Sequence, residues 1–289
     1  MGPIRRTLRP AVVNPRQMVY NASIVDVSNP EIADGPSRRP FVGGRAVRLA
    51  RMVEATLASY LLGYLLTAVG VLVGCAAQAV GAKAVILKGT VLWANLQFWL
   101  VGRRLHVYGR EHLAREVSYV VVANHSSLYD IPALMGAVPG IAIMGREYLT
   151  RIPGFGRLLT ALHYIAVDTE SPRKAHASLE RAAEVARAGV SVGIFPEGTR
   201  TPDGEVKSLR RGFVRVLRKS GLDLVPARIT GTFALKPKGR TTMDPRERIC
   251  VRLGAPVRNA ELTGLSDREI VRQVHALLQS GEGGRDAAL

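Results

Sequence analysis

The segment SYVVVANHSSLYD, residues 118–130, links a strand to a helix and carries two ionisable side chains at the junction. Its first six residues are mostly β-branched or aromatic and predict a buried strand. The polar residues that follow predict a turn, and the largely apolar run at 131–137 predicts a helix. His125 and Asp130 therefore lie between the end of the strand and the start of the helix.

The same alternation of strand and helix continues along the chain. We expect further strands at 140–144, 164–168, 190–195, 224–229 and 249–253, and further helices at 156–162, 172–188, 209–220 and 266–278. This pattern predicts the α/β class, with a single mixed, largely parallel sheet flanked by helices. Sites in such sheets gather where strands end, and both His125 and Glu197 directly follow predicted strands.

An apolar stretch before this domain indicates attachment to a membrane. Residues 55–82 contain no charged side chain, and a helix of that length can cross a hydrocarbon layer of about 30 Å. A second apolar segment, 89–102, is shorter and contains Trp93, Phe98 and Trp99, whose rings favour the membrane interface. We expect an N-terminal membrane-anchoring helical hairpin that enters one leaflet and returns. A single membrane span is the alternative.

Charge and composition limit the partners and the kinds of site that we expect for this chain. The formal charge of +17 at pH 7 favours partners that carry phosphate: nucleic acid, anionic lipid or a phosphorylated substrate. Residues 1–50 predict a disordered basic extension, 51–104 the membrane-associated helices and 105–280 one folded domain, with no secretory signal. Cys75 and Cys250 lack the spacing of a zinc site, so we expect reduced thiols and no bound metal.

The spacing of His125 and Asp130 suggests a base and its orienting acid. Residues five apart on one α-helix diverge by roughly 140°, so His125 must precede the helix while Asp130 lies in its first turn. The carboxylate could then bond one ring nitrogen and leave the other free to take a proton. On spacing alone a different reading is favoured, in which Asn124 or Ser126 caps the helix and His125 merely packs or faces water.

A second polar block, FPEGTR at residues 195–200, follows another apolar run. The planar guanidinium of Arg200 suits a phosphate because it can donate two parallel charge-assisted bonds. Glu197 is suited to hold a cation or to accept a bond from a hydroxyl. Without further context, a tight turn with a surface ion pair between Glu197 and Arg200 is an equal alternative.

Taken together, the two blocks resemble the glycerolipid acyltransferase family, specifically the PlsC-like 1-acylglycerol-3-phosphate acyltransferases. The resemblance covers about residues 90–260 and matches the family's N-H-x-x-x-x-D and F-P-E-G-T-R motifs. It implies that 105–280 is an acyltransferase domain in which His125 is the general base and Asp130 its orienter. It also implies an acceptor site made of Glu197, Gly198, Thr199, Arg200 and Arg146, the last at a position where the family commonly has lysine.

The resemblance is incomplete after the strand predicted at 164–168. The family usually places an arginine directly after the aspartate there, whereas this chain reads Asp168-Thr169. Arg173 or Lys174 could supply the positive charge. The departure leaves a second acceptor open, a lyso-ornithine lipid or other lysolipid.

The resemblance implies transfer of a fatty acyl group from acyl-CoA or acyl-ACP to the hydroxyl of a lysophospholipid, first of all 1-acylglycerol-3-phosphate, to give phosphatidic acid. With no G-x-S-x-G elbow or catalytic-cysteine signature in the chain, direct attack by the hydroxyl is favoured over an acyl-enzyme. We expect no cofactor and no nucleic acid partner, and a location at the cytoplasmic face of the inner membrane. A non-catalytic basic membrane scaffold is the rival, and it predicts that His125 and the Glu197 loop line separate surfaces.

Overall fold

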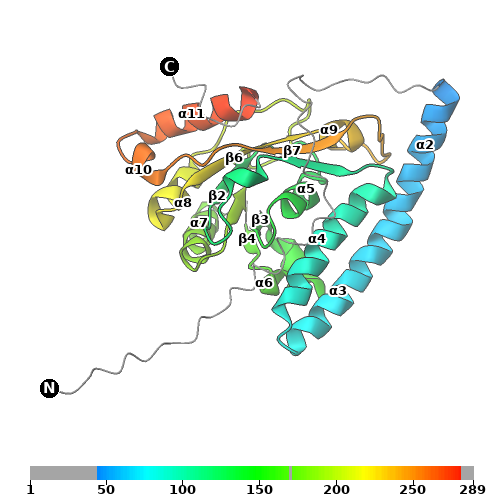
Figure 1. The fold of residues 1–289 in the computed structure, drawn as a ribbon, viewed down its shortest axis with the longest axis horizontal. Helices are drawn as coiled ribbons and strands as arrows, with labels where there is room; N and C mark the ends of the chain where they lie inside the picture. The colour runs from blue at the N-terminus through cyan, green and yellow to red at the C-terminus, as the bar shows by residue number, and fades with distance from the viewer. Residues whose placement is uncertain (1–43, 169–170, 281–289) are drawn as a thin grey trace.

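The computed structural model describes residues 44–168 and 171–280 and contains a seven-stranded sheet (Figure 1). Its order is β1-β7-β6-β2-β5-β3-β4. Within it, β7 runs antiparallel to β6, and the other neighbouring pairs are parallel. The strands are β1 (Leu105–Tyr108), β2 (Val120–Ala123), β3 (Ala142–Arg146), β4 (Ile165–Val167), β5 (Val192–Ile194), β6 (Leu224–Thr230) and β7 (Ile249–Leu253).

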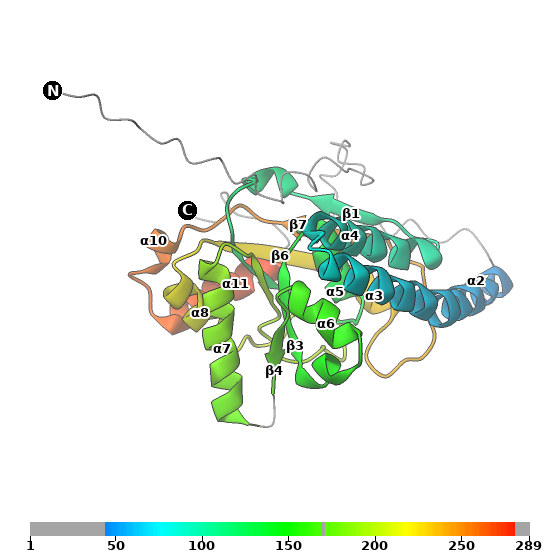
Figure 2. The ribbon, with the colours of Figure 1, turned by 90° about the horizontal axis from the view of Figure 1, so that it is seen from below.

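Helices cover both faces of this sheet (Figures 1 and 2). One face carries α7 (Pro172–Arg187), α8 (Gly212–Ser220) and α11 (Asp267–Ser280). The other carries α4 (Lys83–Leu100), α5 (Asp130–Ala137) and the short α9 (Thr232–Leu235). The remaining elements are α6 (Phe155–Ala161), α10 (Asn259–Leu262) and 3-10 turns at Arg110–His112 and Glu147–Arg151.

The side chains of β2 show how the sheet divides the core. Val121 and Ala123 face the cluster under α5, whereas Val120 and Val122 face the cluster under α7 and α8. All four are fully buried, as expected for a central strand of a largely parallel sheet covered on both sides. The predicted fold class is confirmed.

One strand was missed by the pattern. β1 is four residues long, LHVY, and alternates buried with half-buried side chains directly after Arg103 and Arg104. It lies at the edge of the sheet and pairs with β7. An edge strand this short carries too few β-branched residues to stand out from a loop.

The N-terminal segment is a helical hairpin. α2 (Arg45–Ala58), a π-helical turn at Ser59–Gly63 and α3 (Tyr64–Ala79) make one continuous helix, and α4 returns beside α3 (Figure 1). Two hydrogen bonds show that the helices run antiparallel: Trp93 Nε1 donates to Thr67 Oγ1 at 3.1 Å, and Gln97 Nε2 donates to Gly63 O at 3.4 Å. α4 packs on α5, so it is the inner helix of the pair.

The long helix is apolar enough to enter a membrane. Among the described residues, Arg45–Ala79 is the one helix long and apolar enough to cross a bilayer, and its most apolar part is largely exposed. It begins at Arg45, somewhat before the predicted boundary at residue 51. Residues 1–43, which hold most of the predicted disordered extension, lie outside the described residues.

The first part of this helix is tied to the connection between α9 and β7. Arg48 Nη2 donates to Asp244 Oδ2 at 2.6 Å, and Thr56 Oγ1 accepts from Met243 N at 2.9 Å. Asp244 is almost fully buried. The hairpin is therefore fixed to the sheet domain by polar bonds as well as by apolar packing.

Candidate active site

His125 lies in the turn between β2 and α5, as its spacing from Asp130 predicts. Its Nδ1 is 2.9 Å from Asp130 Oδ2, and its side chain is 15% exposed. Asp130 is the first residue of α5. In the neutral imidazole, Nδ1–H donates to the carboxylate and Nε2 keeps its lone pair. No residue in the described part of the chain bonds to Nε2.

Asp130 is held rigidly in place. Its side chain is fully buried, and Oδ2 also accepts from the backbone N–H groups of Ser126 at 2.6 Å and Ser127 at 2.7 Å. Three donors on one oxygen fix the direction of the carboxylate. The imidazole is therefore anchored to a group that cannot rotate without losing all three bonds.

The capping alternative does not describe this turn. No side chain caps the start of α5. Asn124 instead bonds the backbone of Ile229 twice, donating to its carbonyl at 2.9 Å and accepting from its N–H at 2.7 Å. This pair of bonds joins the end of β2 to β6 and so fixes the backbone that leads into His125.

The second polar block contacts the first directly. Glu197 Oε1 accepts from His125 N at 2.9 Å, and Thr201 N donates to His125 O at 2.9 Å. The ring of Phe195 stacks on the imidazole with centroids 4.3 Å apart. β2 and β5 are parallel neighbours, so the loops that follow them meet at the carboxyl-terminal ends of the strands. His125 and the Glu197 loop line one site, contrary to the scaffold alternative.

Burial dominates the electrostatics of Glu197. Its side chain is almost fully buried, and desolvation raises its pKa, while the backbone N–H groups of His125 and Lys207 act in the opposite direction. The sequence suggested that Glu197 holds a cation or a hydroxyl. In the structure its carboxylate binds the backbone of the base, which makes it a support for His125.

The other predicted acceptor residues lie around this support. Gly198 has φ +70° and closes the turn, Thr199 is exposed, and Arg200 is half-buried. The surface ion pair between Glu197 and Arg200 is not formed within the described ranges 44–168 and 171–280. Arg146 ends β3 and is exposed. β3 pairs in parallel with β5, so Arg146 lies at the same carboxyl-terminal end of the strands as the Glu197 loop.

Of the two residues that could replace the missing arginine, Lys174 is already engaged in an ion pair. Lys174 Nζ lies 3.0 Å from Asp168 Oδ2, and the hydrogen bond to Asp168 raises the pKa of Lys174. Its charge is therefore already balanced by the aspartate that precedes the expected arginine position.

A third segment of the site was not found from the sequence. Ser127 Oγ donates to Lys236 O at 2.8 Å, and Ser127 pairs with Pro237 in an isolated β-bridge. This places the basic run KPKGR, residues 236–240, against the His125 turn. The three cations of this run, which follows β6, suggest a site for an anion, but nothing in the sequence indicated which loop they would face.

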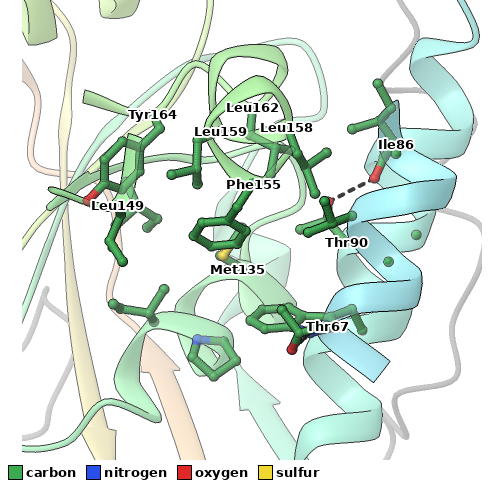
Figure 3. A pocket seen from close by; sticks show the side chains of 18 of the residues that line it. Thr67, Ile86, Thr90, Met135, Leu149, Phe155, Leu158, Leu159, Leu162 and Tyr164 are labelled. Carbon is green, nitrogen blue, oxygen red and sulfur yellow. Dashed lines mark hydrogen bonds between the residues drawn. The ribbon is translucent and has the colours of Figure 1, made fainter. Parts of the chain in front are cut away.

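An apolar cavity of about 270 Å³ adjoins the turn between the hairpin and the sheet domain (Figure 3). Its walls come mainly from α3, α4, α5 and α6, and Leu128 of the His125 turn lines it as well. Figure 3 shows Phe155 and Met135 near the middle of the group of apolar side chains. A cavity with such a lining suits a hydrocarbon chain.

Comparisons with known proteins agree with this geometry. The sequence profile of the family described as Acyltransferase matches residues 104–230. A 1-acyl-sn-glycerol-3-phosphate acyltransferase of Limnanthes alba is 30% identical over 183 residues, 63% of this chain and 64% of that protein. One of Bacillus subtilis (strain 168) is 29% identical over 165 residues, 56% of this chain and 78% of that protein. The chain thus spans less than two thirds of the plant relative's length.

A solved structure has the same fold. The crystal structure of the 1-acyl-sn-glycerophosphate (LPA) acyltransferase, PlsC, from Thermotoga maritima matches with a TM-score of 0.70 and 28% sequence identity. The match covers 81% of this chain and 95% of that one. It extends well beyond residues 104–230, since those residues make up less than half of this chain.

Proposed function

We propose that this chain, which is similar to 1-acyl-sn-glycerol-3-phosphate acyltransferases in sequence and fold, transfers a fatty acyl group from an acyl thioester to the hydroxyl of a lysophospholipid. The observation that carries this proposal is the bond between His125 Nδ1 and Asp130 Oδ2, beside the Glu197 loop. It leaves Nε2 as a base with a fixed direction.

The chemistry needs these groups in a defined order. The acceptor hydroxyl gives its proton to His125 Nε2 while its oxygen bonds to the thioester carbonyl carbon. Asp130 stabilises the imidazolium that forms. The tetrahedral intermediate then breaks its carbon–sulfur bond, and the imidazolium returns the proton to the leaving thiolate. The products are an ester and a free thiol, and the base is regenerated.

The apolar cavity is the place for a fatty chain in this reaction. It is lined by residues of the His125 turn at one side and by α3 and α4 at the other. A chain bound there keeps its carboxyl end near the turn. Burial of each methylene contributes about 0.8 kcal/mol, so the cavity also favours acyl groups that fill it.

We assign 1-acylglycerol-3-phosphate as the acceptor and acyl-CoA or acyl carrier protein as the donor, with phosphatidic acid as the product. The relatives named above support this acceptor. A lyso-ornithine lipid is the second candidate, favoured by the absence of arginine after Asp168 and by the use of Lys174 in an ion pair. In either case the reaction takes place on a membrane, and we place it at the cytoplasmic face, where these donors are made.

Purified full-length protein tests the proposal. With one labelled acyl donor and a panel of lysolipids, wild type should form a single main product, identified by thin-layer separation. His125→Ala should lower turnover by about 10³- to 10⁴-fold while the protein stays folded and membrane-bound. His275→Ala, on α11 behind the sheet, is the matched control and should keep wild-type turnover. A His125→Ala variant with full turnover would reject the assigned base, and a wild type inactive on every lysolipid would favour the scaffold.

A further inference from the structure

The segment 236–240, here called the lysine loop, bridges the two polar blocks of the site. Its first residue is held against the His125 turn through the bond from Ser127 Oγ to Lys236 O. Two residues on, Lys238 Nζ lies 3.4 Å from Thr199 Oγ1 in the Glu197 loop. The loop thus spans from the turn that carries the base to the turn that carries Arg200.

The lysine loop is built to keep its shape. Arg240 binds back onto the carbonyls of Ala234, Leu235 and Thr242, and Lys236 Nζ donates to the carbonyl of Arg240. Of these four carbonyls, that of Arg240 belongs to the loop, and the other three lie within two residues of its ends. The backbone is therefore fixed before any ligand arrives.

Three cations converge where this loop meets the Glu197 loop. Arg200 and Lys236 are half-buried, Lys238 is exposed, and Arg200 acts on Lys236 as a nearby like charge, which together with burial lowers the pKa of Lys236. In the part of the chain that the structure describes, none of the three forms an ion pair with a carboxylate. Several other basic side chains on the domain surface do form such pairs, as with Arg215 and Lys219 on Glu180.

Such an arrangement is unfavourable unless an anion completes it. Like charges that approach in a partly desolvated site repel more strongly than they would in water. An ordinary solvated basic surface keeps its cations apart or pairs them with acids, as this chain does on α8. A phosphomonoester carries close to two negative charges at pH 7 and offers several acceptor oxygens to a guanidinium and two ammonium groups.

We propose that Arg200, Lys236 and Lys238 together form a phosphate subsite that holds the headgroup of the acceptor, with the two lysines as specificity residues. This inference rests on the proposed function, which places a phosphorylated lysolipid at His125. In this subsite the lysine loop supplies the positive charge that an arginine directly after Asp168 would otherwise provide. Coenzyme A also carries phosphates, so the test must separate the two sources.

Ligand binding to a catalytically inactive variant separates the phosphate of the lysolipid from the phosphates of coenzyme A. In detergent-purified full-length protein carrying His125→Ala, equilibrium binding is measured for labelled lysophosphatidate, for a monoacylglycerol with the same chain and for oleoyl-CoA. Lys238→Ala should raise the Kd for lysophosphatidate about tenfold, the loss of one charge-assisted bond at a partly exposed site. The Kd values for monoacylglycerol and oleoyl-CoA should not change. Lys236→Met should act in the same direction, and Lys238→Arg should restore binding.

Lys219→Ala is the matched control because it removes the same charge far from the site. Lys219 lies at the end of α8, close to the start of β6, whereas the site lies at the carboxyl-terminal ends of the strands. The proposal is overturned if the lysine variants weaken all three ligands equally, weaken only oleoyl-CoA, or change nothing. In the active background, the KM for lysophosphatidate should rise while the KM for the donor stays the same. Turnover that is unaffected by the lysines would reject the subsite alone, whereas absent wild-type turnover with intact selective binding would reject the acyl transfer alone.

Discussion

The His125 turn and the apolar cavity lie side by side but are built in opposite ways. In the turn, directional bonds fix the base and its partner: Asp130 Oδ2 has three donors, and the backbone of His125 is bonded on both sides. The cavity is lined by side chains from four helices, which contribute few directional contacts. The turn is set by bond geometry and the cavity by volume.

This difference teaches which kind of change each region tolerates. A proton transfer requires atoms placed to within a fraction of an ångström, so an isosteric change that alters one bond is enough to damage the turn. A hydrocarbon chain requires only space and an apolar lining, so the cavity should accept changes of residue type and respond to changes of size. Four variants test these two regions and their surroundings, starting with the largest expected effect.

Asp130→Asn tests the turn with almost no change in shape. An amide can still accept from the backbone N–H groups of Ser126 and Ser127, but it cannot stabilise an imidazolium. We expect kcat to fall by about 10³-fold, with unfolding temperature changed little. Asp244→Asn is the matched control, since Asp244 is also a buried aspartate but bonds to Arg48. Equal losses of kcat in the two variants would mean that burial of an acid, and not its bond to His125, matters.

Leu61→Glu with Leu65→Glu tests whether the outer surface of the hairpin is held by lipid. Both leucines are largely exposed, at 72% and 59%. Each substitution removes an apolar group worth about 1.5–3 kcal/mol in a hydrophobic environment. Binding to anionic vesicles should fall by roughly a hundredfold or more, while circular dichroism stays unchanged. Ala177→Glu on the exposed α7 adds a charge elsewhere and should leave vesicle binding intact.

Gly70→Leu tests the cavity by reducing its volume. Gly70 lines the cavity, and a Cβ added there has Trp93 Cδ1 as its one neighbour within 4 Å, at 3.9 Å, among the residues that the structure describes. The added carbons should lower kcat/KM for long acyl donors about tenfold relative to short ones, with kcat for the short donors retained. Gly70→Ala should give a smaller shift in the same direction. A uniform loss for all chain lengths would show that the cavity does not hold the acyl chain.

Glu197→Gln should have the smallest effect, on the pH dependence of stability. Burial raises the pKa of Glu197 above its ordinary 4.5, so the folded protein holds this proton more tightly than the unfolded chain does. The stability from this group is complete below about pH 4.5 and is lost as pH rises through the raised pKa. Glutamine does not titrate. Thermal unfolding from about pH 4 to about pH 7 should show wild type losing stability relative to the variant, and parallel curves would contradict the shift.

The sequence carried much of the fold and the centre of the site. The strands at β2, β5 and β6 are central and rich in apolar residues, so their pattern is strong, and the helix period locates α5, α7 and α11. The place of His125 before the helix followed from geometry alone. β1 escaped because an edge strand of four residues is nearly indistinguishable from a loop.

What the sequence could not supply was contact between distant loops. Glu197 looked like a ligand for the acceptor, because a carboxylate in a turn is normally solvated, yet it is buried on the backbone of His125. The lysine loop lies 109 residues from Ser127 along the chain. Its place depends on β6 and β2 being neighbours, which local pattern does not reveal.

The π-helical turn at Ser59–Gly63 has a consequence for how one helix serves two neighbours. Such a turn holds one residue more than an α-helical turn, and one residue changes the phase of a helix by about 100°. α3 can therefore face the cavity while α2 presents Arg48 and Thr56 to Asp244 and Met243. Deleting a single residue there would leave a regular helix of nearly the same length but would break the bonds between its first half and the connection from α9 to β7, which includes the lysine loop. The register of the helix, more than its length, sets how its exposed apolar surface is oriented relative to the lysine loop.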